Sequence, residues 1–357
     1  MSRLFIPGPT DVDPAVSRAQ TRPMVGHRSQ EFVDLFARIQ PKIRKVFQTE
    51  NPVLVTASSG TGLWEGAVKN VVSERLLLLS CGAFGDRWYD VAVGNGIPVD
   101  RIESSWGQPN TPSQVIDTLK NKNYDTVAVV HNETSTGVEN PVAEIVQSAR
   151  SIQPELVIMV DAVSSLGGVD IKPDEWGIDI LVTSSQKCLA LPPGLAFASV
   201  SERALKRAQS IAHRGWYFDL LRLEKYMKRS MTPATPAISL LNALDDQLSR
   251  ILEEGLEARF DRHSKMAVFI RDWAAERFKL FAAEGHRSNT VTTILNTREV
   301  DIPHLNNFLA EHEMVIANGY GKLKGETFRI GHMGETQLSD LEILIGRIDQ
   351  FLDLQSR

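Results

Sequence analysis

Short apolar segments without polar–apolar alternation recur through the first half of the chain, at residues 52–56, 75–80, 126–131, 156–161 and 178–183. A strand with one face in water alternates, so segments that do not alternate are expected to be covered on both faces. Helical patterns separate most of these segments, as at residues 63–72. The sequence therefore predicts an α/β domain in which a mostly parallel sheet carries helices on both faces.

The pattern changes after about residue 236. Amphipathic helices are expected at 238–256, 260–278, 303–313 and 338–354, with short strands at 290–295 and 327–330. This order is typical of a smaller α+β domain, and a length of 357 residues fits two domains and a short arm. We predict an N-terminal arm at 1–20, a large domain at 21–245 and a small C-terminal domain at 246–357. The last boundary falls inside the first long helix.

Composition excludes several classes of protein. The net charge of −5, from 39 Lys and Arg against 44 Asp and Glu, gives no basic surface for nucleic acid or an anionic membrane. No apolar run approaches the roughly 20 residues of a membrane span, and the N-terminus lacks the apolar core of a signal peptide. Cys81 and Cys188 are the only cysteines, too few for a disulfide framework or a Cys-rich zinc site. We therefore expect a reduced, cytoplasmic protein with no metal site.

Polar and small residues follow the expected strands, at residues 58–61, 82–84, 131–134, 161–163 and 184–187. In an open parallel sheet, ligands bind beyond the carboxyl ends of the strands. We therefore expect a hydroxyl- and glycine-rich turn, an aromatic ring, a carboxylate and a lysine to meet at one edge of the sheet.

The turn at residues 58–62, SSGTG, leads into a helix. Glycine lets a phosphate approach the backbone closely, and a helix N-terminus offers free N–H groups. The turn lacks the lysine of a P-loop and the spacing of GxGxxG, so no nucleotide-binding motif is matched. Taken alone, it fits a strand-to-helix turn with a Ser or Thr cap better than a phosphate site.

Asp161 ends one expected strand and Lys187 follows the next, 26 residues later (187 − 161). A carboxylate at the tip of a buried strand needs a partner, which is a protonated heteroaromatic nitrogen, a helix cap or a structural arginine. Lys187 lies in SSQKCLALPPG, where partial burial would lower its pKa, as a Schiff-base or general-base lysine requires. An ordinary solvated lysine is the alternative. The spacing of one helix and one strand places the two residues on neighbouring strand ends.

A set of longer stretches carries a family resemblance. They are PGPTDVDPAV, SSGTGLWEGAV, HNETSTGVENP, VDAVSSLGGVDI, TSSQKCLALPPG, TPAISLLNAL and FRIGHMG, and they run from residue 7 to residue 334. In this order they resemble the class V, fold-type I aminotransferases that use pyridoxal 5'-phosphate, of the alanine/serine–glyoxylate (serine–pyruvate) type. VDAVSSLGG followed by SSQKCLALPPG is the most specific part of the resemblance.

The resemblance implies a role for each residue at the sheet edge. Lys187 would form the Schiff base with pyridoxal 5'-phosphate and move the proton during catalysis. Asp161 would pair with the pyridinium nitrogen and keep the ring cationic. The phosphate of the cofactor would be bound by Ser59, Gly60, Thr61 and Gln186.

Further residues match positions around the ring. Phe84 matches an aromatic residue that stacks on the cofactor, often a larger Trp, while Thr134 matches a residue beside the ring hydroxyl. Val163 would pack on the opposite face of the ring. Thr235 matches a threonine that reaches the phosphate of the neighbouring subunit, which implies a homodimer. The tyrosine that usually accompanies this threonine is absent from the sequence around residue 235.

Arg329, in the stretch FRIG, matches the arginine that binds the α-carboxylate of the substrate. A planar guanidinium holds a carboxylate by two parallel hydrogen bonds, which orients the substrate relative to the cofactor. A surface ion pair is the alternative for this arginine.

The first functional hypothesis is a transaminase that moves the amino group of serine or alanine to glyoxylate or pyruvate. An alternative with the same fold is a phosphoserine or 2-aminoethylphosphonate transaminase, in which His27 and Arg28 would bind the second phosphate or phosphonate. A remote alternative is a non-catalytic nucleotide-binding or oxidoreductase-associated subunit. A cysteine desulfurase is not expected, because it needs a persulfide-carrying cysteine in the C-terminal half and no cysteine follows Cys188.

Overall fold

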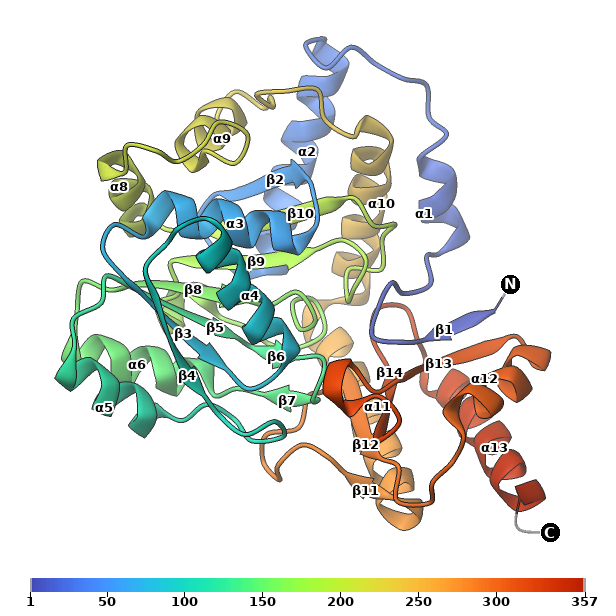
Figure 1. Ribbon diagram of the computed structural model, residues 1–357. Helices are drawn as coiled ribbons and strands as arrows, with labels where there is room; N and C mark the ends of the chain where they lie inside the picture. The colour runs from blue at the N-terminus through green and yellow to red at the C-terminus, as the bar shows by residue number, and fades with distance from the viewer. Residues whose placement is uncertain (1, 356–357) are drawn as a thin grey trace.

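The computed structural model describes residues 2–355, which form two larger sheets and a short two-stranded one (Figure 1). The seven-stranded sheet has the order β2-β10-β9-β8-β5-β3-β4. Its strands are β2 (Val53–Ala57), β3 (Leu76–Ser80), β4 (Val99–Glu103), β5 (Thr126–Val130), β8 (Val157–Asp161), β9 (Ile180–Ser184) and β10 (Leu195–Val200). All neighbours are parallel except β10, which runs antiparallel to both β2 and β9. The mostly parallel sheet is confirmed.

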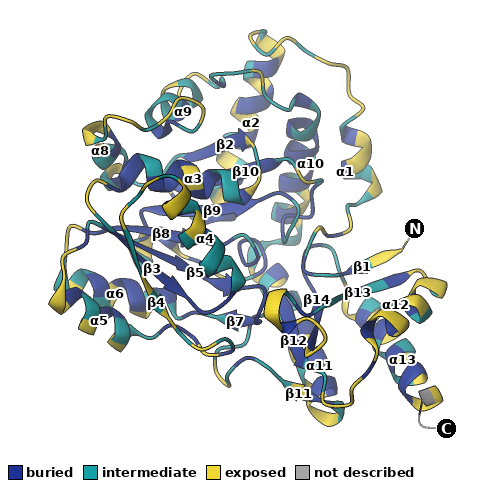
Figure 2. Cartoon of the chain, viewed as in Figure 1, coloured by how far each residue is buried: buried dark blue, intermediate teal, exposed yellow. Residues whose placement is uncertain are grey.

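Two hydrophobic clusters cover the two faces of this sheet, as strand β8 shows. Ile158 and Val160 belong to one cluster, whereas Val157 and Met159 belong to the other. The first cluster lies under helices α2 (Gln30–Phe47), α5 (Pro112–Asn121), α6 (Val142–Ile152) and α10 (Ile238–Glu254), and the second under α3 (Gly60–Val71), α4 (Ala83–Gly94), α8 (Glu202–Ser210) and α9 (Leu220–Met227). Both faces of the central strands are buried (Figure 2), which explains why their sequences do not alternate.

The structure differs from the sequence-based expectation at three elements of this domain. Helix α3 begins at Gly60 instead of residue 63, because the extended backbone of Ser59 already forms its N-cap. Strand β4 was not expected, since its sequence VDRIE is polar and the strand lies at an edge of the sheet. Strand β10 was not expected either, and a buried run such as LAFASV carries no signal of strand direction.

The second sheet has five strands in the order β1-β13-β14-β12-β11. These are β1 (Arg3–Phe5), β13 (Met314–Asn318), β14 (Thr327–Gly331), β12 (Val291–Leu295) and β11 (Lys279–Leu280). Helices α11 (Leu256–Arg277), α12 (Ile302–Glu311) and α13 (Leu338–Gln355) accompany it, and a separate hydrophobic cluster with Ile270, Leu305 and Leu344 fills the space between them. The N-terminal strand β1 pairs with β13, so the first described residues of the chain form an edge strand of the sheet built from its last third (Figure 1).

Short elements complete the described chain: α1 (Pro14–Ala19), the pair β6 (Asn132–Glu133) and β7 (Val138–Glu139), α7 (Pro173–Trp176) and the 3-10 turn η1 (Gly321–Leu323). Helix α10 contributes to the core of the large sheet as far as Ile251, and α11 contributes to the core of the small sheet from Met266. The domain limits 1–20, 21–245 and 246–357 stay a prediction. Within residues 2–355, no helix is both long and apolar enough to cross a bilayer.

Candidate active site

Asp161 is the last residue of β8, between the carboxyl ends of β5 and β9. Its side chain is buried, and Oδ1 accepts a 2.7 Å hydrogen bond from the Val163 N–H. Burial raises the pKa of Asp161 to about 7, while the hydrogen bond from Val163 and the charge of Lys187 act in the opposite direction. No cationic side chain in the described part of the chain forms an ion pair with this carboxyl group. A buried carboxylate in this position therefore suits a cationic ligand.

Lys187 follows β9 and lies within electrostatic range of Asp161, since each group shifts the pKa of the other. Burial lowers the pKa of Lys187 to about 8, and the positive charge of Arg329 lowers it as well. An amine with this pKa is partly uncharged at neutral pH and can act as a nucleophile or a base.

The N-terminal segment closes over this lysine. Lys187 Nζ donates a hydrogen bond to the Pro7 carbonyl. A Cβ atom at Gly8 would lie 2.5 Å from Lys187 Cδ, so only glycine permits this approach. The Thr10 N–H donates to the Gln186 carbonyl at 3.1 Å, which ties the same segment to the residue before the lysine. This stretch, PGPT, is part of the family resemblance, which implies no role for Pro7 or Gly8.

The start of α3 forms a cradle beside Asp161 and Lys187. A Cβ atom at Gly60 would lie 2.7 Å from Val163 Cγ2 and 3.8 Å from Ser184 Oγ. Ser184 Oγ is buried without a hydrogen-bond partner among the described residues. Ser59 and Thr61 flank the glycine at the first turn of the helix, whose free N–H groups favour an anion. The glycine cradle, the orphaned hydroxyl and the helix terminus together fit a phosphate group.

Phe84, in the first turn of α4, takes part in an aromatic and cationic stack. Its ring lies 5.4 Å from the ring of Tyr320, and the Arg87 guanidinium lies 4.9 Å from the Phe84 centroid. Arg87 Nη2 donates to the Tyr320 hydroxyl at 2.5 Å. Tyr320 lies in the loop between β13 of the small sheet and η1 (Gly321–Leu323), so the stack joins the two parts of the chain next to the strand ends.

Thr134 lies on the turn between β6 and β7 and contacts both the large sheet and the small one. Its Oγ1 lies 2.5 Å from Ser164 Oγ, and its carbonyl accepts a 3.2 Å hydrogen bond from Arg329 Nη1. The hydroxyl of Thr134 is thus close to the loop that follows Asp161.

Arg329 lies in the middle of β14, with only 7% of the residue exposed. Its Nε donates to the Asn318 carbonyl at 3.1 Å, and its guanidinium carbon lies 5.4 Å from the centroid of Tyr320. Burial lowers the pKa of Arg329 to about 10, and no carboxylate among residues 2–355 forms a salt bridge with it. A buried guanidinium without a carboxylate partner favours the binding of a carboxylate group from a ligand.

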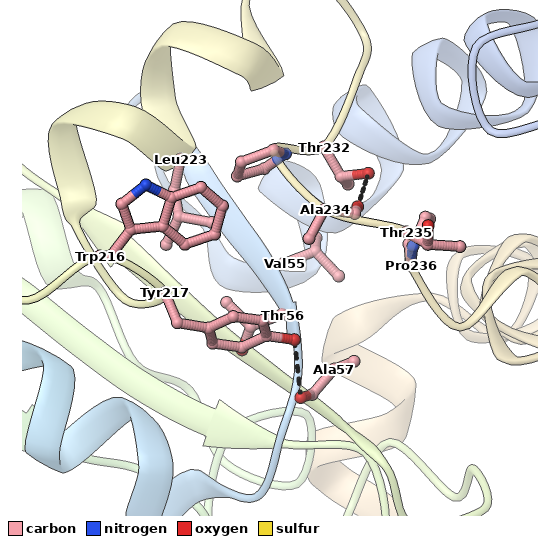
Figure 3. A pocket seen from close by; sticks show the side chains of 11 residues that line it. Val55, Thr56, Ala57, Trp216, Tyr217, Leu223, Thr232, Ala234, Thr235 and Pro236 are labelled. Atoms are coloured by element: carbon pink, nitrogen blue, oxygen red, sulfur yellow. Dashed lines mark hydrogen bonds between the residues drawn. The ribbon is translucent and has the colours of Figure 1, made fainter.

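Thr235 lies elsewhere in the single chain. Thr235 is exposed and lines a pocket together with Val55, Ala57, Trp216 and Tyr217 (Figure 3). Ala57 is the last residue of β2 and lies two positions before Ser59. Trp216 and Tyr217 are 55% and 44% exposed, although both are large and apolar. A tyrosine does line this pocket, but it comes from position 217 instead of the stretch beside Thr235, and its hydroxyl lies 3.5 Å from the Ala57 carbonyl.

The second-phosphate candidates lie beside the same loop. Arg28 donates to the Thr232 carbonyl at 2.8 Å and lies 5.7 Å from the centroid of Tyr226. It also donates to the carbonyl of its neighbour His27 at 3.2 Å. Its two terminal nitrogens therefore both donate to backbone carbonyls, since Nη2 lies 3.4 Å from the Pro233 carbonyl.

Besides Pro7 and Gly8, sequence reasoning assigned no role to Arg87, Glu133, Ser164, Ser184 and Tyr320, which the structure places at the site. Glu133 and Ser164 lie within stretches that carried the family resemblance, HNETSTGVENP and VDAVSSLGGVDI, so a signal for them existed. The sequence carried no signal for Arg87 and Tyr320, because these two residues meet only through the packing of the small sheet's loop against α4.

Comparison with known proteins defines the class. A family model described as aminotransferase class-V matches residues 15–323, and the chain belongs to this family. It is an enzyme of the transaminase type, on the fold of the pyridoxal 5'-phosphate-dependent fold-type I aminotransferases. This confirms the resemblance, the fold class and the enzyme class that the sequence predicted.

Individual relatives cover nearly the whole chain. A serine–glyoxylate aminotransferase of Methylorubrum extorquens is 34% identical, over 96% of this chain and 88% of the relative. A protein of Synechococcus sp. named as the small subunit of a soluble hydrogenase is 36% identical, over 98% and 92%. The solved structure of an alanine–glyoxylate aminotransferase from Nostoc sp. is similar with a TM-score of 0.92 and 32% identity, over 99% of this chain and 96% of that one.

Proposed function

We propose that this transaminase uses pyridoxal 5'-phosphate bound to Lys187 and moves the amino group of serine or alanine to glyoxylate or pyruvate. The observation that carries the proposal is the buried guanidinium of Arg329, which has no carboxylate partner among the described residues and shifts the pKa of Lys187. A cation that binds a carboxylate beside an amine of lowered pKa suits an amino acid substrate. When bound, pyridoxal 5'-phosphate supplies an electron sink for the carbanion at the substrate Cα.

The cradle at the start of α3 would bind the cofactor phosphate through Ser59, Gly60 and Thr61, with Gln186 as a further contact. Ser184 Oγ supports this placement, because its buried hydroxyl has no hydrogen-bond partner within the described chain. The Asp161 carboxylate would form an ion pair with the protonated ring nitrogen of the cofactor and accept a hydrogen bond from it. Its raised pKa would return toward the ordinary range there, since a cation stabilises the carboxylate form.

The faces and the edge of the cofactor ring would contact three further side chains. Phe84 would stack on one face, and Val163, whose Cγ2 would lie 2.7 Å from a Cβ atom at Gly60, would cover the other. Thr134 would hydrogen-bond the ring hydroxyl. Its own hydroxyl is oriented by Ser164 Oγ, 2.5 Å away.

Lys187 would move the proton at the substrate Cα. Its lowered pKa leaves a fraction of the amine uncharged near neutral pH, and the Pro7 carbonyl accepts a hydrogen bond from Nζ. The covering segment 7–10 would also exclude water from the reacting atoms.

Arg329 would bind the α-carboxylate of each substrate in turn. Its guanidinium is fixed at two points by the carbonyls of Asn318 and Thr134, so the carboxylate would be held in one orientation relative to Lys187. Glyoxylate, pyruvate, serine and alanine all carry this group. The relatives named for glyoxylate support small substrates of this kind.

The alternatives have less support. A phosphoserine or aminophosphonate substrate would need cationic donors for a second phosphate, and Arg28 Nη1 already donates to the carbonyls of His27 and Thr232. A non-catalytic subunit would have no use for a buried, unpaired arginine and an amine of lowered pKa at one edge of a sheet. One relative is named as a hydrogenase subunit, and that name applies to the relative and not to this chain.

A homodimer is part of the proposal. The exposed Trp216 and Tyr217 lie beside Thr235, and contact with a second copy would cover them and bring Thr235 to the partner's phosphate cradle. A cytoplasmic location is also proposed, because Cys81 and Cys188 are both free thiols.

The decisive experiment is spectroscopic. The chain purified with pyridoxal 5'-phosphate should show a visible absorbance band that borohydride bleaches, and peptide mapping should find the reduced label on Lys187. Amino-group transfer from serine and alanine to glyoxylate and pyruvate, with phosphoserine and 2-aminoethylphosphonate as competing donors, then tests the substrate class. A chain that binds no cofactor, or that carries the label on another lysine, contradicts the proposal.

A further inference from the structure

Glu133 is a fully buried carboxylate to which the proposed reaction assigns no role. It ends the short strand β6, beside the first turn of α4 (Figure 1). Burying a carboxylate costs free energy unless its oxygen atoms are hydrogen-bonded, so its contacts reveal what it does.

The carboxylate binds the start of α4. Oε2 accepts hydrogen bonds of 3.1 Å from the N–H groups of both Phe84 and Gly85. A negative charge at a helix N-terminus is favoured by the free N–H groups and by the helix dipole. Gly82 makes the approach possible, because a Cβ atom there would lie 2.4 Å from Glu133 Cγ.

The same carboxylate binds its own loop. Oε1 accepts a 2.6 Å hydrogen bond from Ser135 Oγ and a 3.1 Å bond from the Ser135 N–H. Ser135 Oγ in turn accepts a 3.0 Å hydrogen bond from the Ala83 N–H. Three consecutive N–H groups of the first turn of α4, those of residues 83–85, are therefore fixed to the loop 133–135 through one carboxylate and one hydroxyl.

This arrangement connects three candidate site residues. Phe84 lies on the helix turn that Glu133 holds, and Thr134 lies between Glu133 and Ser135. The Thr134 carbonyl receives Nη1 of Arg329. The charge of Glu133 also reaches the site, since it raises the pKa of both Asp161 and Arg329.

We propose that Glu133 is a positioning residue, which locks the first turn of α4 to the loop 133–135 and so sets where Phe84 and Thr134 meet the cofactor ring and where Arg329 meets the substrate carboxylate. The inference rests on the proposed function, because it assumes that the cofactor ring lies between these residues. Glu133 itself contacts neither cofactor nor substrate.

The test compares Glu133→Gln with Asp301→Asn, a matched change at the N-cap of α12, where Asp301 Oδ1 accepts from the His304 N–H at 3.0 Å. The amide of Glu133→Gln keeps one acceptor oxygen but turns an NH2 group toward N–H donors. We expect faster amide hydrogen exchange at residues 83–85, with a dissociation constant for pyridoxal 5'-phosphate and a KM for the amino donor both raised by about tenfold or more. Asp301→Asn should lower the melting temperature and leave all three values unchanged.

A Glu133→Gln protein with a lower melting temperature but native exchange at 83–85, native cofactor affinity and native KM overturns the proposal. If that variant does not fold, Ser135→Ala decides instead, because it frees the Ala83 N–H and removes one donor to Glu133. It should change the three values in the same direction by a smaller factor, and native values would overturn the proposal. If the unmodified chain binds no cofactor, the proposed function fails, whereas hydrogen exchange still reports on the lock itself.

Discussion

The carbonyl of Thr134 accepts a 3.2 Å hydrogen bond from Nη1 of Arg329, across 195 residues of sequence. This bond joins a turn at the carboxyl edge of the large sheet to the central part of a strand in the small sheet. Because Thr134 is the candidate for the ring hydroxyl and Arg329 the candidate for the substrate carboxylate, one hydrogen bond sets the spacing between the proposed cofactor and substrate sites.

Lys187→Ala should retain pyridoxal 5'-phosphate without a covalent bond and lose transamination by several orders of magnitude. The loss follows because the variant removes the amine that holds the cofactor and moves the proton. Borohydride reduction followed by mass spectrometry measures the covalent bond, and single-turnover kinetics measure the chemical step. A variant that still fixes the label after reduction would show that another lysine carries the cofactor.

Asp161→Asn should cripple proton abstraction while preserving the fold, because a neutral amide cannot hold the ring nitrogen protonated. We expect a loss on the order of a few kcal/mol in transition-state stabilisation, as for other single electrostatic groups at active sites. Steady-state kinetics on serine and alanine provide the measurement. Turnover close to that of the native enzyme would make Asp161 a structural residue.

In the cofactor-free protein, Asp161→Asn should be favourable, because it should raise the thermal stability of the fold at alkaline pH. Burial raises the pKa of Asp161 to about 7, so the folded chain holds the proton more tightly than the unfolded chain does. The stability that this group contributes is present below the ordinary aspartate pKa, near 4, and is lost as the pH rises toward 7. Apo Asp161→Asn should therefore unfold at a higher temperature than the apo native chain at pH 8, and the difference should shrink by pH 4. Equal melting temperatures at pH 8 would show that the carboxylate carries no burial penalty.

The sequence predicted the strand-end residues and missed the contacts made between the two sheets. Asp161 and Lys187 follow buried strands, so their meeting at one edge is a consequence of parallel pairing, and it needs no knowledge of side-chain packing. Arg329 lies in the second sheet, and no spacing rule links it to Lys187, so only the family resemblance identified it. The stack of Tyr320 on Phe84 depends on how a loop of the small sheet packs on α4, and local patterns carry no such information.

The oligomeric state provides a further prediction. Thr235 is exposed beside Trp216 and Tyr217, in a pocket that a second copy of the chain would cover if the enzyme is a homodimer. Trp216→Asp should weaken the dimer, because it removes a large aromatic contact and places a charged group in the interface. Cofactor affinity should fall with it, since the partner's threonine would leave the phosphate. Sedimentation across a range of protein concentrations measures the first effect, and an active monomer of the native chain at assay concentration would refute the dimer.

Arg329→Lys bears most directly on the class of substrate. A lysine keeps the positive charge but loses the planar fork that grips a carboxylate with two hydrogen bonds. Lysine also lacks the two separate nitrogens, Nε and Nη1, from which the Asn318 and Thr134 carbonyls now accept hydrogen bonds and which orient the guanidinium. Binding should therefore weaken by about tenfold or more for serine, alanine, glyoxylate and pyruvate alike, because all four present the same group to the same site.

The cofactor serves as the internal control for this variant. Arg329 lies in the small sheet and outside the cradle at Gly60, so the visible spectrum of the bound cofactor should change little. An amine without a carboxylate should react poorly with the native enzyme and should be little affected by the substitution, since it never used the guanidinium. Half-reaction kinetics with the four substrates and with such an amine, on both forms of the enzyme, separate the two effects. If Arg329→Lys processes all four acids as well as the native enzyme does, the carboxylate binds elsewhere, and the assignment of small amino acids as substrates loses the observation on which it rests.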